Sequence, residues 1–173
     1  MEKIFYTNRS KYPSTDEALT HVFSRFYGIE RPVIVRNENG KKYLAESEQR
    51  LFFSVSHTEN LLFIAISNEN VGLDAERIDR TIVYEPIVKK FPQEERKEIL
   101  STQDFLQHWT AKEAAVKWLG GALAHDLYKL SFIGGTLYYK QAALPQVSFL
   151  QMEEHLLAVC GERDFSKAEA VRF

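Results

Sequence analysis

Residues 71–78, with the sequence VGLDAERI, combine apolar side chains and two carboxylates in a pattern typical of a strand. Side chains alternate between the two faces of a strand, so Asp74 and Glu76 should lie close together on one face. Neighbouring carboxylates repel each other unless a cation or a proton lies between them. One interpretation is a divalent-cation site, since hard oxygen ligands suit Mg²⁺. The other is an edge strand whose outer face contacts water.

The composition indicates a globular chain. Its 173 residues are 45% hydrophobic, which is enough to fill a sizeable core. The 22 basic and 24 acidic residues nearly balance, so the overall charge predicts neither a nucleic-acid partner nor a membrane surface. The single cysteine, Cys160, rules out an internal disulfide and suggests a reducing compartment. With no signal-peptide pattern and no long apolar run, we expect a cytoplasmic protein.

The first third of the chain predicts one helix followed by strands. Ser14 or Thr15 is suited to cap the helix, and Gly28 is suited to end it. Between them, apolar residues recur at helical spacing: Leu19, Val22, Phe23 and Phe26. Strand patterns then follow at residues 32–37, 42–46, 51–57, 60–67 and 70–77.

The rest of the chain again predicts helices and then strands. Helical patterns cover residues 83–91, 92–100 and 102–120, the last ended by Gly120 and Gly121. Strand patterns follow at residues 128–134, 136–141, 146–152 and 155–161. A helix followed by strands thus occurs twice, which suggests a repeated architecture without visible sequence identity between the two parts.

The long helix predicted at residues 102–120 carries two charges on one face. Glu113 and Lys117 are four residues apart, and Trp109 lies one turn earlier on the same side. The expected core positions place both charges at the border of the core: Phe105, Leu106, Trp109, Val116 and Leu119. The simplest interpretation is an exposed ion pair worth a few tenths of a kcal/mol. A functional role needs other residues beside it.

A third polar group, Ser56, His57 and Thr58, stands at the end of a predicted strand. Polar side chains and free backbone N–H groups in such a place can bind an anion, although a single histidine is often structural. The other histidines lie in helical or strand contexts without a companion ligand: His21, His108, His125 and His155. The sequence contains no Cys/His zinc spacing and no glycine-rich phosphate loop.

Together, three segments resemble a known family. FSVSHT at 53–58, VGLDAE at 71–76 and WTAKEAAVK at 109–117 are similar, in this order, to the signature blocks of Sfp-type 4′-phosphopantetheinyl transferases. The common forms of these blocks read N-x-S-H-S, G-I-D-x-E and W-x-x-K-E-A/S-x-x-K. The resemblance covers residues 38 to 123, and each block alone is a weak signal.

The resemblance implies an enzyme that moves the phosphopantetheine arm of coenzyme A onto a serine of an acyl or peptidyl carrier protein. Such holo-[acyl-carrier-protein] synthases release adenosine 3′,5′-bisphosphate. By the match, Asp74, Glu76 and Glu113 would hold Mg²⁺ against the coenzyme A pyrophosphate. Glu113 would also take the serine proton, directly or through a water, and Lys117 would contact the pyrophosphate. Lys112 lies off this helix face, and we assign it no catalytic role.

The resemblance also implies coenzyme A contacts from the first half of the chain. Ser56 and His57 match positions that bind its phosphate groups, and Lys41 matches a lysine near the nucleotide, with Lys42 as a weaker match. Two departures stand out. Gly121 occupies a position where members often have a lysine, and the short N-terminal half offers only a few candidates for a nucleotide clasp: Arg9, Lys11, Arg25 and Arg31.

The implied fold is α+β, a 4′-phosphopantetheinyl transferase-like fold. It has two similar halves, 1–70 with the nucleotide-side contacts and 71–173 with the metal site and catalytic helix. Each half would be a small, mainly antiparallel sheet packed on a long helix. We expect a monomer, because two halves in one chain mimic the interface that shorter, trimeric members form between chains.

Two alternatives remain at this level. The chain could be a catalytically weak or inactive relative that binds coenzyme A or a carrier protein without transfer, as the short N-terminal half and Gly121 suggest. It could also be an interaction module whose acidic residues form a wet strand face. The second alternative predicts that neither Mg²⁺ nor coenzyme A stabilises the fold.

Overall fold

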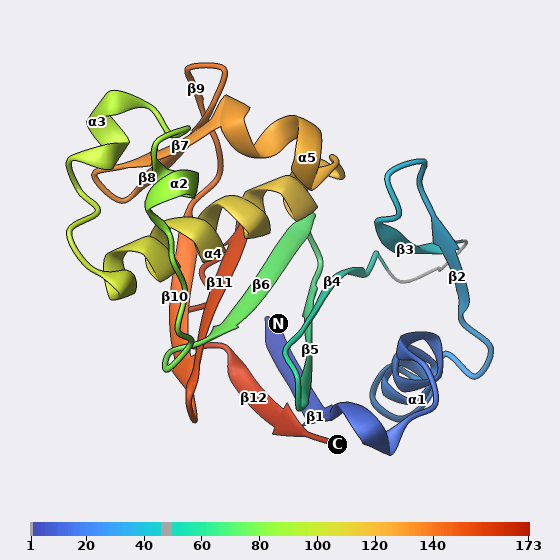
Figure 1. Cartoon of the computed structure of the whole chain (residues 1–173). Coiled ribbons are helices and arrows are strands. Elements are labelled where there is room, and N and C mark those ends of the chain that lie inside the picture. Colours follow the sequence, from blue (N-terminus) through green and yellow to red (C-terminus); the bar gives the residue numbers. More distant parts are fainter. Residues whose placement is uncertain (1, 46–49) are drawn as a thin grey trace.

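Two of the four small sheets and the two long helices form the main body of this mixed α+β structure, a computed structural model that describes residues 2–45 and 50–173. One sheet has the order β12-β1-β5-β4, formed by Glu169–Arg172, Lys3–Asn8, Leu61–Ser67 and Phe52–His57. The other has the order β10-β11-β6, formed by Val147–Met152, His155–Gly161 and Val71–Arg77. Helix α4 lies across the second sheet, and α1 lies at the opposite end of the molecule (Figure 1).

Helix α1, Thr15–Tyr27, has the bounds that its sequence predicts. The side chain of Ser14 accepts a hydrogen bond from the backbone N–H of Glu17, and Gly28 ends the helix in the left-handed conformation, at φ 70°. Its buried face packs against the first sheet through residues that include Leu19, Phe23, Phe5 and Ile64. Phe26, expected in the core, is 37% exposed and contacts the ring of Phe5.

Helix α4, Thr102–Leu119, is also confirmed, with Ser101 as its N-cap and Gly120 in the left-handed conformation at its end. It approaches β6 closely because both surfaces are small. Ala111, Ala114 and Ala115 are fully buried on the helix. A side chain at Gly72 on β6 would collide with the backbone of Ala114 and Trp118, so this glycine is required for the close approach.

Serine hydroxyls of β4 join this strand to the facing edge of β6. The backbone N–H of Leu73 donates to Ser54 Oγ at 2.9 Å, and that of Ala75 donates to Ser56 Oγ at 3.2 Å. We call these two contacts the serine bridge between the sheets. Because of this bridge, the interpretation of a wet edge strand is wrong for Asp74, which is only 4% exposed.

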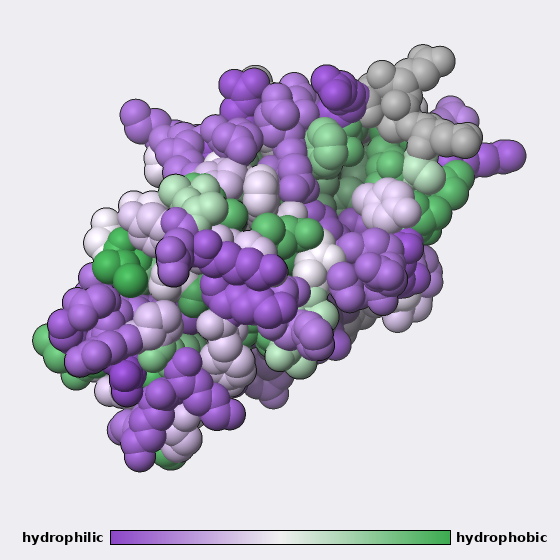
Figure 2. All heavy atoms as spheres, turned by 90° about the horizontal axis from the view of Figure 1, so that it is seen from above, coloured by the Kyte–Doolittle hydropathy of each residue, from purple (hydrophilic) through white to green (hydrophobic). Residues whose placement is uncertain are grey.

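The remaining elements are short. They are β2 (Val33–Arg36), β3 (Lys42–Ala45), α2 (Glu85–Val88), α3 (Gln93–Arg96), α5 (Leu123–Asp126), β7 (Leu130–Ile133), β8 (Thr136–Tyr139) and β9 (Ala142–Ala143), with 3₁₀ turns at Arg9–Lys11 and Leu127–Lys129. Figure 2 shows polar side chains over most of the face seen from above, with apolar ones exposed in several places, among them the end that carries β2 and β3.

The predicted strands from 32 to 77 and from 128 to 161 are confirmed, with Glu46 lying outside the described residues. The predicted helices at 83–91 and 92–100 contain only the four-residue α2 and α3. Strands β1 and β12 were not predicted, and β12 pairs parallel to β1, with Lys3 opposite Glu169. The last strand of the chain therefore lies in the sheet of the first strands. The similarity of the two halves stays a prediction.

A buried ion pair fastens α3 to the middle of α4. The side chains of Glu95 and Lys112 are completely buried, and Lys112 Nζ donates to Glu95 Oε2 at 3.1 Å. His108 Nδ1 lies 3.2 Å from the other carboxylate oxygen, and the ammonium group lies 3.4 Å from the centre of the Phe91 ring. Lys112 thus has a structural environment away from Glu113.

Among the described residues, none of the helices has the length and apolarity to cross a membrane.

Removing one member of this buried pair should be costly. We expect Lys112→Met to lower the free energy of unfolding by about 3–5 kcal/mol, because the buried carboxylate of Glu95 loses its ammonium partner and keeps only the contact with His108. The combined change Glu95→Gln and Lys112→Met should recover much of the loss. Urea denaturation measures both. Lys97→Met, which breaks the exposed pair with Glu94, serves as the control and should cost no more than about 1 kcal/mol.

Candidate metal and phosphate site

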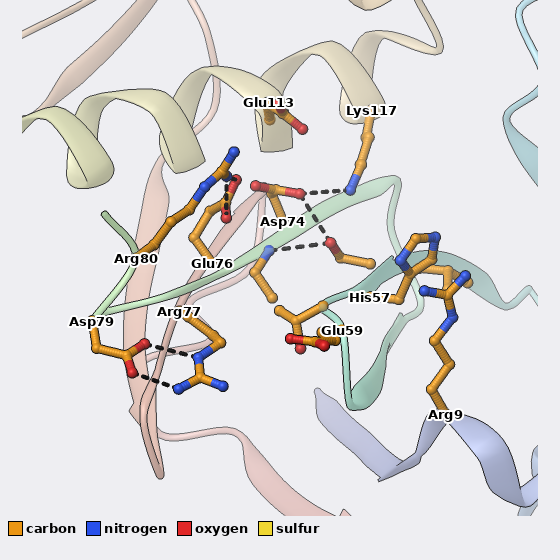
Figure 3. A pocket seen from close by; sticks show the side chains of 14 residues that line it. Arg9, His57, Glu59, Asp74, Glu76, Arg77, Asp79, Arg80, Glu113 and Lys117 are labelled. Carbon is orange, nitrogen blue, oxygen red and sulfur yellow. Dashed lines mark hydrogen bonds and ion pairs between the residues drawn. The ribbon is translucent and has the colours of Figure 1, made fainter. Parts of the chain in front are cut away.

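A cavity of about 800 Å³ opens between β4, β6 and α4, and most of the residues singled out from the sequence line it. Figure 3 shows Glu113 and Lys117 on α4 beside Asp74 and Glu76 on β6, with His57 on the other side of the cavity. The cavity therefore brings together side chains from three elements that are far apart in the chain.

Asp74 is the most firmly held of the acidic residues. Its Oδ1 atom accepts hydrogen bonds from Lys117 Nζ at 2.8 Å and from Ser56 Oγ at 2.9 Å. Its buried Oδ2 atom has no hydrogen-bond partner within residues 2–45 and 50–173. A buried carboxylate oxygen without a donor is costly, so one side of Asp74 is oriented while the other is suited to a cation.

Glu76 is paired with an arginine that the sequence analysis did not single out. Arg80 Nη1 donates to both carboxylate oxygens of Glu76 at 2.7 Å. Burial raises the pKa of Glu76, while the hydrogen bond from Arg80 opposes the rise. The spacing of four residues gave no signal, because it lies across a strand end and a turn rather than on a helix.

Glu113 has a strongly perturbed pKa. Burial raises its pKa to about 8, reinforced by the nearby charge of Asp74 and opposed by Lys117. In the described part of the chain, Lys117 pairs with Asp74 and forms no ion pair with Glu113. The interpretation of an ordinary pair within the helix is therefore wrong.

The three acidic residues can share one cation. Asp74, Glu76 and Glu113 each offer a carboxylate oxygen, and these atoms all lie within 4.8 Å of one another. Asp74 Oδ2 is buried without a donor, and the charge of Asp74 adds to the effect of burial in raising the pKa of Glu113, so a cation at this point would relieve both. An all-oxygen donor set of this kind suits Mg²⁺, which takes a few carboxylates and completes its shell with water and phosphate oxygens.

The predicted phosphate contacts have different surroundings. His57 lines the main cavity, and its pKa is lowered by partial desolvation of the ring and by the nearby charges of Arg9 and Lys117. Arg9 and Lys117 place positive charge beside the acidic residues, while the lowered pKa keeps the His57 ring neutral over more of the pH range. The hydroxyl of Ser56 is engaged by Asp74, and Thr58 Oγ1 lies 3.0 Å from His155 Nε2. A contact of Ser56 or His57 with coenzyme A stays a prediction.

Lys41 lines a second cavity of about 330 Å³, which shares His57 and Lys117 with the first. Its Nζ atom donates to Asn70 Oδ1 at 2.8 Å and to the backbone carbonyl of Trp118 at 3.3 Å. Burial lowers the pKa of Lys41 to about 8. The predicted contact of Lys41 with a nucleotide stays untested, and its side chain is already engaged by the protein.

The raised pKa of Glu113 makes stability depend on pH. In metal-free protein, the folded state binds the Glu113 proton up to about pH 8, whereas the ordinary pKa is 4.5. The stabilisation from this bound proton is complete below the ordinary pKa of 4.5. It is lost as the pH rises through the folded-state pKa of about 8. We expect the free energy of unfolding to fall across this window, measured by urea denaturation with a chelator. Glu113→Gln should make this slope shallower and leave the contribution of Glu76, whose pKa is also raised. Exposed Glu94→Gln should leave the slope unchanged. Equal slopes for wild type and Glu113→Gln would contradict the assignment.

Comparison with known proteins gives an independent assignment. The model of the 4′-phosphopantetheinyl transferase superfamily matches residues 70–160, just over half of the chain, including Asp74, Glu76, Glu113 and Lys117. The chain is also 27% identical over 138 residues to the 4′-phosphopantetheinyl transferase HetI of Nostoc sp. (strain PCC 7120). That alignment covers 69% of this chain and 56% of HetI, so the chain spans little more than half of its relative. By the family match, the chain belongs to the 4′-phosphopantetheinyl transferase superfamily.

Proposed function

We propose that this protein transfers the 4′-phosphopantetheine arm of coenzyme A to a serine hydroxyl of an acyl or peptidyl carrier protein. The observation that carries the proposal is the convergence of Asp74, Glu76 and Glu113, with Lys117 beside them, in a cavity of a chain from this superfamily. The activity in the name of HetI belongs to that protein, and its extension to this chain is part of the proposal.

The acidic residues would hold a magnesium ion. Asp74 would bind through its unpartnered Oδ2 atom, while Ser56 and Lys117 keep the other oxygen in place. Glu113 would bind from the helix side and Glu76 from the strand. When bound, Mg²⁺ would neutralise charge on the pyrophosphate oxygens and orient the phosphorus that is attacked.

The cationic residues would bind the phosphate groups. Lys117 lies between the acidic residues and His57, where its ammonium group can contact both a carboxylate and a pyrophosphate oxygen. His57 and Arg9 lie farther along the cavity wall, suited to a phosphate of the nucleotide. A phosphate dianion would raise the lowered pKa of His57 and strengthen that contact.

The reaction exchanges one phosphorus–oxygen bond for another. The serine oxygen of the carrier forms a bond to the phosphorus that bears the pantetheine arm. The bond from this phosphorus to the bridging oxygen of the pyrophosphate breaks, and adenosine 3′,5′-bisphosphate leaves with the electron pair. Glu113 accepts the serine proton, directly or through a water. Bound Mg²⁺ would keep Glu113 ionised, so that it can accept the proton, but would make it a weaker base, and a water relay therefore suits the transfer as well as direct contact.

We also infer that the two parts of the chain contribute different residues to the site. Residues 1–70 would contribute the nucleotide-side contacts, and residues 71–173 the metal site and catalytic helix. Since β4 and β6 of the same chain line both sides of the cavity, a second copy is not needed to complete it. We therefore expect a monomer, which light scattering can test. The single buried thiol of Cys160 fits a reducing, cytoplasmic setting.

The central test is transfer to a carrier. A carrier protein from the same source, incubated with coenzyme A, Mg²⁺ and this protein, should gain the mass of one phosphopantetheinyl group in a mass spectrum. Glu113→Gln should keep the fold and lower the rate by about 10²- to 10⁴-fold, as expected for the loss of a general base. Glu94→Gln, an exposed change on α3, is the matched control.

The same experiment separates the alternatives. If no carrier protein from the same source gains mass, but thermal unfolding shows that coenzyme A and Mg²⁺ raise the melting temperature, the chain is a binding relative without transfer. If neither ligand stabilises the fold, it is an interaction module. A ligand at 100 times its Kd should stabilise the folded state by about 2.7 kcal/mol.

A further prediction concerns Arg80, which competes with a cation for Glu76. Arg80→Gln frees the carboxylate from a charge-assisted contact. We expect calorimetry to show several-fold tighter Mg²⁺ binding in this variant. Arg96→Gln, in α3, should leave the affinity unchanged. Weaker Mg²⁺ binding in Arg80→Gln would show that the arginine does not compete for the metal ligand.

A further inference from the structure

The C-terminal end of α4 is capped by side chains from an earlier part of the chain. The last carbonyl groups of a helix lack partners within it. Here the carbonyl of Trp118 accepts from Asn70 Nδ2 at 2.8 Å and from Lys41 Nζ at 3.3 Å. The carbonyl of Gly120 accepts from the side-chain amides of Asn37 and Asn39, both at 2.9 Å. Four donors that precede β6 in the sequence thus converge on two carbonyls.

The turn that carries three of these donors has a defined shape. Asn37 Oδ1 accepts from the backbone N–H groups of Asn39 at 3.0 Å and Lys41 at 2.9 Å, and Gly40 has a φ of 84°. This turn joins β2 to β3. A side chain at Gly120 would lie 3.1 Å from Asn37 Nδ2, so the glycine leaves room for the turn to approach. The shape of the turn therefore places the amides of Asn37 and Asn39 on the helix end, and the charge of Lys41 is added to these contacts.

The ammonium group of Lys41 has its three donors engaged. An ammonium has three N–H groups and accepts none. Lys41 Nζ has three oxygen partners: Asn70 Oδ1 at 2.8 Å, the Trp118 carbonyl at 3.3 Å and the Val71 carbonyl at 3.5 Å. These partners belong to the end of α4 and the start of β6. A positive charge at this place also complements the negative end of the helix dipole. Contact with a phosphate would require one of these bonds to break.

The cap lies next to a residue of the proposed site. Lys117 directly precedes Trp118, and its Nζ atom reaches Asp74 Oδ1 on β6. Lys41 joins the same two elements, one residue from Lys117 on α4 and three residues from Asp74 on β6. We propose that Lys41 is a positioning residue, which holds the end of α4 on β6 so that Lys117 stays beside Asp74, and that it does not bind a phosphate of the nucleotide. The catalytic consequence rests on the proposed function.

The two roles of Lys41 predict different ligand preferences. Lys41→Met removes the charge and the donors but keeps most of the stem. Calorimetry would compare the dissociation constants of coenzyme A and dephospho-coenzyme A, which lacks the 3′-phosphate, in wild type and variant. A positioning role leaves the ratio of the two constants within twofold of wild type. If Lys41→Met lowers the dissociation constant of dephospho-coenzyme A divided by that of coenzyme A by tenfold or more, Lys41 is a 3′-phosphate ligand and the proposal is overturned.

A positioning role should also lower kcat. A displacement of about 1 Å at Lys117 can cost up to about 100-fold in rate. We expect Lys41→Met and Asn70→Ala to lower kcat for transfer by similar factors, and the double variant to lose little more. Lys41→Arg should recover part of the rate, since it restores a charged donor. Asn70 carries no charge and cannot replace a phosphate-binding lysine, so an unchanged kcat in Asn70→Ala would contradict the proposal.

Hydrogen exchange tests the cap without any activity. Lys41→Met should speed amide exchange at residues 117–121, and the milder Asn39→Ala should do so to a smaller degree, which covers the case in which Lys41→Met folds poorly. Lys42→Met is the matched control, because Lys42 pairs with Asp16 at 2.7 Å. It should leave exchange at the helix end unchanged. Wild-type exchange in Lys41→Met would refute the cap. Failed transfer by wild-type protein, with the exchange effect present, would refute only the proposed function.

Discussion

Three carboxylates share a confined space, and much of the structure around them balances their repulsion. Lys117 neutralises Asp74, and Arg80 neutralises Glu76. Glu113, with a pKa of about 8, is neutralised by a proton when the pH is lower than this value. Two cations and one proton thus match three negative charges. A divalent cation with phosphate ligands would meet the same demand. The cluster is therefore poised between a protonated, ion-paired state and a metal-bound one, and this balance underlies the proposed chemistry.

The cluster exists because two sheets and one helix meet without large side chains between them. Gly72 lets α4 approach β6, and the serine bridge of Ser54 and Ser56 joins β4 to the edge of β6. Each hydroxyl occupies the place where a further strand would offer a carbonyl. Ser56 then uses its proton on Asp74. One small residue therefore connects the sheets and orients a carboxylate, so the architecture and the site cannot be changed independently.

The sequence predicted the parts whose signals are local. The caps of α1, the glycine that ends α4 and the alternation in β4 and β6 depend on neighbouring residues. The shared face of Asp74 and Glu76 follows from strand geometry. Strands β1 and β12 were missed because their pairing joins the two ends of the chain. Arg80 was missed because a turn brings it back to Glu76. The buried pair of Lys112 was not predicted because its partner Glu95 lies in another element. Contacts between distant segments leave no periodic pattern.

The departures from the family pattern also have a local explanation. Gly121 stands where many members have a lysine, which suggested a weakened enzyme. In this structure a side chain at Gly121 would collide with the carboxylate of Asp126, which accepts a hydrogen bond from the backbone of Ala122. A lysine there would require the Asp126 side chain to move and to give up its contact with the backbone of Ala122. Positive charge at this helix end comes instead from Lys41, which belongs to the turn between β2 and β3. The loss of one lysine is thus a change in how the helix end is built, and it does not by itself indicate a lost activity.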